Sequence, residues 1–307
     1  MALQLLDEEG SFNIFSNSEE VSTGGGRERV GQATIVVSLD GTGDADSIQD
    51  GIDLLPIRGG VVFVKEGIYK IDTQINIAKN RIKIMGTGKG TKIIATTDIS
   101  IFTITGDDIT ITDIHIEGNG SSTSDGILIN ANSNTTIRNC YIEENNYGIE
   151  IDTASNIIIT ECFIFQNDSS GIFTSGASGN NIISNNIIYS NGDEGIWIDG
   201  ANTIIESNII YSNTASGIEV AANSMTITGN FLNANGAVGI NLRGGISYCI
   251  VSNNRIRNST GDDINVTNSG CTGNIIVGNQ VSGTNIGIID DNGTDTQVGH
   301  NITRAEL

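Results

Sequence analysis

The sequence predicts an all-β fold, a right-handed parallel β-helix of about ten coils with a short N-terminal capping helix. The first observation is a repeat. Gly-Ile-x-Ile or a close variant recurs every 22–24 residues, at Gly126, Gly148, Gly171, Gly195, Gly217, Gly239, Asp263 and Gly287. The second is composition, because 39 Gly, a single Pro and abundant Ile, Thr and Asn suit short strands joined by tight turns.

Each repeat is expected to form one coil with three strands. The Gly-Ile-x-Ile strand is followed by a polar turn, a second strand such as residues 156–160, a tight corner, and a third strand such as residues 186–189. Strands this short cannot bury a face alone, so successive coils should stack about 4.8 Å apart into three parallel sheets. The two-residue period of a strand then directs two isoleucine columns inward, one of them Ile142, Ile164, Ile188, Ile210, Leu232 and Ile256.

A polar column marks the corner before the third strand. Asparagine occupies it in five coils, at Asn186, Asn208, Asn230, Asn254 and Asn279. Stacked Asn side chains can hydrogen-bond along the stack, and Asn tolerates the left-handed conformation of a tight corner. Cys140 and Cys162 hold the two preceding positions. Because the four cysteines form no CxxC pair, we expect buried, reduced thiols and no metal site.

The repeats divide the chain into four segments: a flexible or assembly-docking arm over 1–32, a cap and first coils over 33–99, regular coils over 100–302, and a tail over 303–307. A short helix is predicted within residues 40–56, capped by Ser47, Asp46 or Asp44, with Ile48, Ile52 and Leu55 on one face. Such a helix would cover the open end of the stack, which repeat proteins need.

The run DADSIQDGIDLLPIRGGVVFVKEGIYKI, followed by INIAKNRIKIMGTGKGTKII, resembles the opening of the pectate-lyase-like right-handed parallel β-helix superfamily. It is closest in pattern to the N-terminal segments of phage tailspikes and polysaccharide lyases, and is also similar to that of alginate epimerases. The resemblance covers about residues 38–302 and implies the fold, but this fold carries many chemistries. The catalytic motifs of its enzymes are missing, since neither His115 nor His300 lies in one and the only proline is Pro56.

One outward face suits sugar. Phe173 and Trp197 occupy outward positions of successive Gly-Ile-x-Ile strands, surrounded by charged residues. Aromatic rings offer flat platforms and carboxylates bind hydroxyls, which predicts glycan-binding residues at Phe173, Trp197, Glu150, Asp152 and Arg243. Asp199 and Glu219 lie on neighbouring coils and are the candidates for a catalytic carboxylate pair. The alternative is an ordinary mixed surface.

A second face is apolar over five coils. Monomers rarely expose so large a patch, so we expect it to be buried in a homo-oligomer, most simply a parallel homotrimer. A long loop over it is the alternative, although the loops there are short. The predicted interface is Tyr141, Phe163, Phe165, Ile187, Tyr189, Ile209, Tyr211 and Phe231.

A net charge of −21 and a pI near 4.2 argue against nucleic-acid or membrane partners. No cofactor is expected, Ca²⁺ being the one ion that the acidic surface would suit. No secretory signal or membrane-spanning run is found, which indicates synthesis in the cytoplasm and use on a virion or extracellular surface, attached through the N-terminal arm.

Three functions remain open from the sequence. The first is a virion structural or host-attachment protein, such as a tailspike, fibre or surface decoration, that binds cell-surface glycans. The second is a carbohydrate-active enzyme, a polysaccharide lyase, glycoside hydrolase or epimerase acting on an extracellular polysaccharide. The third is a non-viral adhesin or scaffold. The missing catalytic motifs favour a role without catalysis.

Overall fold

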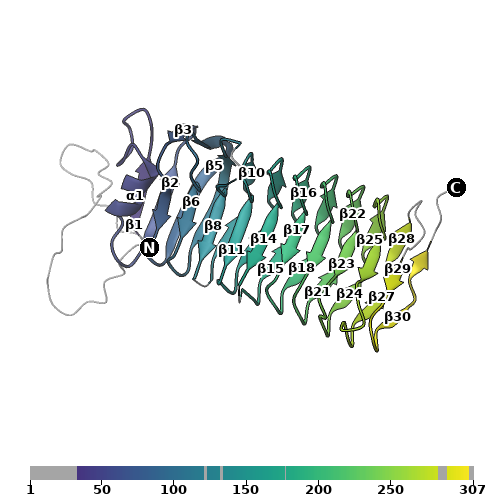
Figure 1. Cartoon of the computed structure of the whole chain (residues 1–307). Coiled ribbons are helices and arrows are strands. Elements are labelled where there is room, and N and C mark those ends of the chain that lie inside the picture. Colours follow the sequence, from purple (N-terminus) through teal and green to yellow (C-terminus); the bar gives the residue numbers. More distant parts are fainter. Residues whose placement is uncertain (1–32, 121–122, 132–133, 177, 283–288, 304–307) are drawn as a thin grey trace, which may run out of the picture. The chain divides into compact units, whose positions relative to one another are not determined.

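A computed structural model describes residues 33–120, 123–131, 134–176, 178–282 and 289–303. These residues belong to one compact unit, 32–307, whose coils stack one after another as a parallel β-solenoid (Figure 1). The arm over 1–32 lies outside the described residues. Within the described ranges, no helix is long and apolar enough to cross a membrane.

The strands form three ladders, named here by the order of the strands in each coil. The first ladder contains the Gly-Ile-x-Ile strands, and all its neighbours pair in parallel and in register. Its ten members are β4 (Ile75–Ile77), β6 (Phe102–Ile104), β8 (Ile127–Asn130), β11 (Ile149–Asp152), β14 (Ile172–Ser175), β17 (Ile196–Ile198), β20 (Ile218–Val220), β23 (Ile240–Leu242), β26 (Ile264–Val266) and β29 (Ile289–Asp291).

The second ladder follows the polar turn of each coil. Its members are β1 (Ala33–Val37), β2 (Gly60–Val64), the start of β5 (Ile82–Ala95), the start of β7 (Thr110–Glu117), β9 (Thr136–Arg138), β12 (Ile158–Thr160), β15 (Ile182–Ser184), β18 (Ile204–Glu206), β21 (Thr226–Thr228), β24 (Ile250–Ser252), β27 (Ile275–Val277) and β30 (Gln297–Gly299).

The third ladder follows the tight corner. It consists of β3 (Gly67–Ile71), the ends of β5 and β7, β10 (Tyr141–Glu143), β13 (Phe163–Phe165), β16 (Ile187–Tyr189), β19 (Ile209–Tyr211), β22 (Phe231–Asn233), β25 (Arg255–Arg257), β28 (Gln280–Ser282) and β31 (Ile302–Thr303).

The prediction of three separate sheets is wrong in one respect. β5 and β7 run through the corner without ending, and their pairing shifts register between Met85 and Lys92. This continuous pair joins the second and third ladders into one 21-stranded sheet, while the first ladder forms a separate 10-stranded sheet. The corner becomes sharp only from β9 and β10 onward, where two short strands replace one long strand.

The predicted capping helix is confirmed. Helix α1 spans Ile48–Leu54, and the side chain of its N-cap residue Ser47 accepts a hydrogen bond from the Asp50 amide. Ile48, Ile52 and Leu55 are buried, at 3, 1 and 3% exposure. The helix contacts β1, β2 and β4, so it covers apolar side chains of the first coils.

The interior is a continuous stack of aliphatic side chains. The inward isoleucines named above are 0% exposed, and each contributes about 1.5–3 kcal/mol by burial. The glycines that begin the first-ladder strands lie against this core. A Cβ on Gly195 would lie 2.6 Å from Ile210 Cγ2 and 2.7 Å from the Gly217 carbonyl oxygen, so the position accepts only glycine without displacement of the backbone.

The predicted asparagine column is a hydrogen-bonded ladder. Asn208 Oδ1 accepts from the backbone amide and the side-chain Nδ2 of Asn186, at 2.9 and 3.0 Å, and Asn208 Nδ2 donates to Asn230 Oδ1. The left-handed residue of the corner, however, is the preceding one, such as Ser207 with φ 57°. All four cysteines are free and buried, as expected.

A second asparagine ladder, which the sequence reading missed, closes the other end of the third-ladder strands. Asn191 Nδ2 donates to Asn213 Oδ1 at 2.9 Å, and the same pattern joins the other members. The amides thus satisfy the buried backbone at both corners of each coil. The members are Asn145, Asn167, Asn191, Asn213 and Asn235.

Candidate functional site

The outward column of the first ladder holds an aromatic row. Phe173 and Trp197 are paired in register on β14 and β17, and their rings meet edge to face with centroids 5.5 Å apart. Tyr147, in the turn before β11, stacks on Phe173 at 4.5 Å and 18°. We expected Phe173 and Trp197 to lie in solvent. Both are half-buried instead, because the three rings cover one another.

Charged and polar side chains lie at the C-terminal side of this aromatic row. Arg243 lies over the Trp197 ring, 5.8 Å from its centroid, and donates to Glu219 Oε1 at 3.0 Å. Asn241 donates to both oxygens of Glu219. Glu219 is therefore not the solvent-facing acid that the sequence suggested, since it is 4% exposed with its carboxylate engaged by two donors.

The two predicted catalytic carboxylates have different partners. Asp199 is exposed and accepts a hydrogen bond from Trp197 Nε1 at 3.1 Å, whereas Glu219 is bound by Asn241 and Arg243. Asp199 therefore orients the indole ring, and Glu219 orients the guanidinium group that covers it. Both residues support the platform.

A carboxyl pair at the N-terminal side of the row was missed. Asp125, which precedes the repeat glycine of its coil, is 6% exposed and shares a hydrogen bond with Glu150. Asp125 Oδ1 also accepts from the Tyr147 amide at 3.2 Å. The signal was the column one residue before each glycine, which the repeat analysis did not follow: Asp125, Tyr147, Ser170, Glu194 and Ser216.

Burial makes this pair retain a proton. Desolvation, the hydrogen bond that protonated Glu150 donates to Asp125, and the nearby charges of Asp125 and Asp152 raise the pKa of Glu150 to about 7. Burial likewise raises the pKa of Asp125. Two carboxyl groups in contact cannot both ionise easily, so near neutral pH the pair holds a transferable proton beside the aromatic row.

Glu194 adds another buried acid on the coil of Trp197. It is 8% exposed, and its carboxylate accepts from Ser170 Oγ at 2.9 Å. Desolvation raises its pKa against the lowering effect of the serine. The face therefore joins aromatic platforms to carboxyl groups in several environments, which suits sugar rings and their hydroxyls.

The apolar strip predicted on the third ladder is continuous. Phe165, Tyr189 and Tyr211 are register partners and stack nearly parallel, at 5.0 Å and 3° and then 4.9 Å and 1°. Tyr141 stacks on Phe163 at 4.7 Å. This self-stacking leaves the rings half-buried, and Ile209 is 40% exposed. Arg255 and Arg257 lie over Phe231 at the end of the strip.

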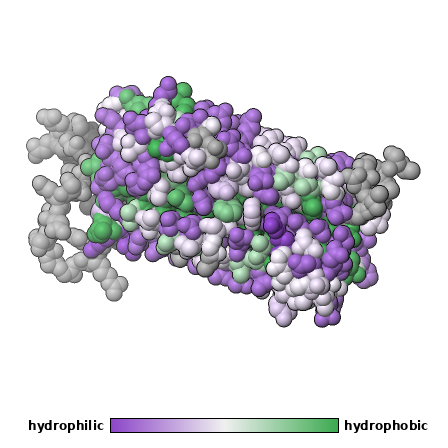
Figure 2. Space-filling view, viewed as in Figure 1, coloured by the Kyte–Doolittle hydropathy of each residue, from purple (hydrophilic) through white to green (hydrophobic). Residues whose placement is uncertain are grey.

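The second ladder presents another apolar column that the sequence reading missed. Its outward members pair in register, and four are 36–39% exposed. Asn134, Thr136, Asn156 and Asn180 lie beside its first members around a shallow pocket of about 340 Å³. On the face seen in Figure 2, apolar residues form separate patches within a largely hydrophilic surface. The column is Ile158, Ile182 and Ile204, followed beyond Thr226 by Ile250 and Ile275.

A family model described as "Right handed beta helix region" matches residues 65–203, 100–255 and 177–304. The chain belongs to this right-handed β-helix family. Among curated proteins, the β-helix matches the probable pectinesterase 67 of Arabidopsis thaliana, with 35% identity over 71 residues. That match covers 22% of this chain and 21% of the pectinesterase.

Solved structures share the fold at low identity. ORF18 of Geobacillus virus E2 has a TM-score of 0.61 and 15% identity, over 84% of this chain but only 57% of the viral chain. The A-module of mannuronan C-5 epimerase AlgE4 from Azotobacter vinelandii has a TM-score of 0.63 and 17% identity, over 86% of this chain and 93% of the epimerase module. The DFA-IIIase of Arthrobacter chlorophenolicus has a TM-score of 0.68 and 16% identity, over 80% of this chain and 74% of the DFA-IIIase.

Proposed function

We propose that this β-helix binds a surface glycan along the first ladder, as part of a virion structural or host-attachment protein. The row Tyr147–Phe173–Trp197 carries this proposal. Three rings on successive coils, with centroids 4.5 and 5.5 Å apart and edged by carboxylates and one arginine, form a continuous apolar row against which a sugar ring can pack. The similarity in fold to ORF18 of Geobacillus virus E2 supports the proposed virion setting.

The negative charge of the chain limits which class of glycan this face can bind. The chain carries −21 net, and the row lies between Asp125, Glu150, Asp152 and Glu194, with Arg243 as a nearby cation. A polyuronate would be repelled by this surface. A neutral glycan keeps the stacking and hydroxyl contacts without that repulsion, so we infer a neutral hexose polymer.

Binding to a panel of neutral and uronic-acid polysaccharides tests this function. The expected result is retention on a neutral polymer, weakened about tenfold by Trp197→Ala, which corresponds to roughly 1.4 kcal/mol. Tyr248→Ala is the matched control, because Tyr248 is 71% exposed and belongs to a different turn. Equal binding by the Trp197 and Tyr248 variants, or a preference for polyuronates, would contradict the proposal.

Oligomerisation is the second part of the proposal. The stacked strip of the third ladder is apolar over five coils and would be buried between copies of this chain, in a parallel homotrimer. Parallel association matches the strip, because its residues repeat at the coil spacing and equivalent positions of each copy meet at the same height. The N-terminal arm would attach the assembly to a virion or another surface.

Catalysis is a second candidate function, favoured by the Asp125–Glu150 pair. Glu150 is half-buried beside the aromatic row and would donate its proton to the leaving oxygen of a glycosidic bond. Asp152 lies two residues further along the same strand, about 6.6 Å away along the backbone. This distance is near the separation between the two carboxyl groups that is typical of inverting hydrolases. Asp152 would accept the proton of the water that adds to the anomeric carbon.

Release of new reducing ends from the same polysaccharides tests catalysis. Glu150→Gln should reduce turnover by about 10²–10⁴-fold, and turnover should fall as pH rises through about 7, where Glu150 loses its proton. Glu206→Gln, on β18 of the second ladder, is the matched control. Glycan binding without turnover would leave attachment as the sole function.

A further inference from the structure

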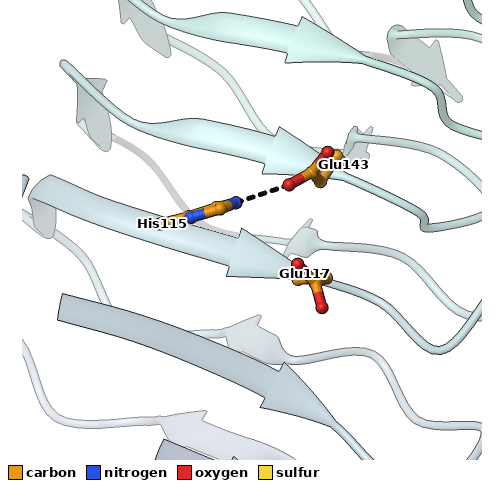
Figure 3. Close-up of side chains that lie close together, drawn as sticks. All are labelled: His115, Glu117 and Glu143. Atoms are coloured by element: carbon orange, nitrogen blue, oxygen red, sulfur yellow. Dashed lines mark hydrogen bonds and ion pairs between the residues drawn. The ribbon is translucent and has the colours of Figure 1, made fainter. Parts of the chain in front are cut away.

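Three ligating side chains gather on the third ladder, away from the glycan face. His115 and Glu117 lie on β7, two residues apart, and Glu143 ends the neighbouring strand β10. In the ladder register Tyr141 pairs with His115 and Glu143 pairs with Glu117. Figure 3 shows the three side chains near the ends of these two adjacent strands.

The donor atoms are already close. His115 Nε2 lies 2.7 Å from Glu143 Oε1, and one ligating atom from each of the three residues falls within 4.8 Å of the others. Their side chains are 12, 19 and 16% exposed for His115, Glu117 and Glu143. An ion held here would be partly shielded from water and reachable from one side.

Glu117 and Glu143 are paired on neighbouring strands, so a positive charge nearby is needed to offset the repulsion between their carboxylates. Carboxylates at directly paired positions on one face of a sheet repel each other. Lys92 on β5, the register partner of His115, forms an ion pair with Glu117, and its side chain is 25% exposed. His115 contacts Glu143. The partly exposed lysine side chain can move into solvent, which frees Glu117 for another cation.

We propose that His115, Glu117 and Glu143 bind a divalent transition-metal ion, with Zn²⁺ as the best match. One imidazole nitrogen and two carboxylates form a three-ligand set that Zn²⁺ accepts, with bonds of about 2.0–2.2 Å. A tetrahedral site of that size places donor atoms roughly 3.4 Å apart. Small side-chain rotations therefore suffice, with no movement of the paired strands.

The ligand set discriminates against Ca²⁺ and Mg²⁺. Ca²⁺ takes six to eight oxygen ligands and Mg²⁺ retains an octahedron of oxygens, whereas an imidazole favours Zn²⁺ and its transition-metal neighbours. Lys92 acts as the competitor that the metal displaces. Removing its charge should therefore tighten binding, whereas removing a ligand should weaken it.

Calorimetric titration of the full chain with Zn²⁺ in a chelator-free buffer tests the site. One ion per chain is expected, with at least about tenfold weaker binding for His115→Ala and for Glu143→Gln. Lys92→Met should bind Zn²⁺ more tightly than the natural chain. His300→Ala, at an exposed position, is the matched control and should bind like the natural chain. Circular dichroism checks that each variant keeps its β structure.

Co²⁺ gives an independent readout of the ligands. Its visible absorption should indicate nitrogen and oxygen ligands and should disappear with His115→Ala. A thiolate charge-transfer band would overturn the proposal, because it would place the ion on cysteines. Several weak Zn²⁺ equivalents that are insensitive to His115→Ala would mean adventitious binding and would also overturn it. So would unchanged affinity in Lys92→Met, since Lys92 would then not compete for Glu117.

Discussion

Gly239 and Asp263 hold the same place in successive coils, and a Cβ on Gly239 would lie 2.4 Å from the Asp263 carbonyl oxygen. Asp263 places a carboxyl group where the preceding coils carry glycine. It is 2% exposed, and among the described residues neither of its carboxyl oxygens has a well-formed hydrogen bond, although Ser259 and the Ser282 amide lie close enough to lower its pKa. Burial raises its pKa to about 6.

Asp263→Asn should stabilise the protein at pH 7, by up to roughly 3 kcal/mol. The folded-state pKa lies above that of the unfolded chain, so the loss of stability builds up between about pH 4 and pH 6 and is complete above pH 6. The gain should therefore disappear near pH 4. Urea unfolding at both pH values measures it, with the exposed Asp168→Asn as control. A gain of equal size at pH 4 would contradict the assignment to ionisation.

Gly195→Ala should destabilise the β-helix by about 1–3 kcal/mol, because the new methyl group overlaps Ile210 and the Gly217 carbonyl oxygen. Gly299→Ala is the comparison, since a Cβ there meets nothing within 4 Å. Denaturant midpoints of the two variants should differ clearly. Equal midpoints would mean that the stack relaxes around the added carbon.

Asn208→Ala should cost about 2–4 kcal/mol, because it leaves the Asn186 amide and the Ile183 carbonyl group buried without their partner. Asn233→Ala removes one exposed hydrogen bond, to Asn258, and should change the free energy of unfolding little. Urea titrations of the two variants provide the measurement. A loss for Asn208→Ala no larger than that for Asn233→Ala would show that water replaces the ladder.

Phe163→Glu combined with Tyr189→Glu should dissociate the proposed trimer into monomers, because it places two charges on each copy of the stacked strip. Ile182→Glu combined with Ile204→Glu, on the second ladder, should leave the trimer intact. Light scattering coupled to size exclusion measures the mass. A monomeric natural chain, or dissociation by the Ile182 and Ile204 pair, would reject the strip as the interface.

Salt should strengthen the same trimer. Each copy carries −21, so association brings like charges together, and ions screen that repulsion within about 10 Å at 0.1 M. Sedimentation at low and high salt should show a larger trimer fraction at high salt. The reverse dependence would indicate an interface formed by opposite charges instead.

The sequence predicted most of the fold because one repeat controls register. Once Gly195 and Gly217 are aligned, Trp197 and Glu219 must pair, as they do. The same reasoning could not determine where a side chain turns after it leaves the sheet. Asp199 and Glu219 were therefore expected as a pair, whereas Asp199 accepts a hydrogen bond from Trp197 and Glu219 accepts one from Arg243.

Contacts outside the repeat motif were harder to predict. Asp125 lies one residue before a glycine, in a column of mixed residue types, so the column places Asp125 beside the first ladder but does not indicate its contact with Glu150. His115 and Glu143 meet because the end of β7 pairs with β10 in the third ladder. His115 lies before the first Gly-Ile-x-Ile repeat at Gly126, so the repeat did not give its register.

The spacing between the two asparagine ladders has a consequence for how this surface can evolve. Asn186 and Asn191, Asn208 and Asn213, and Asn230 and Asn235 are each five residues apart, so the third-ladder strand between them keeps a constant length. The stretch from the first residue of the repeat to the asparagine column before the third strand varies, from thirteen residues after Gly195 to sixteen after Asp263. Differences in length therefore fall mainly in the loops that begin at Asp152, Asp199 and Arg243, where they can create recognition of new ligands while the scaffold stays intact.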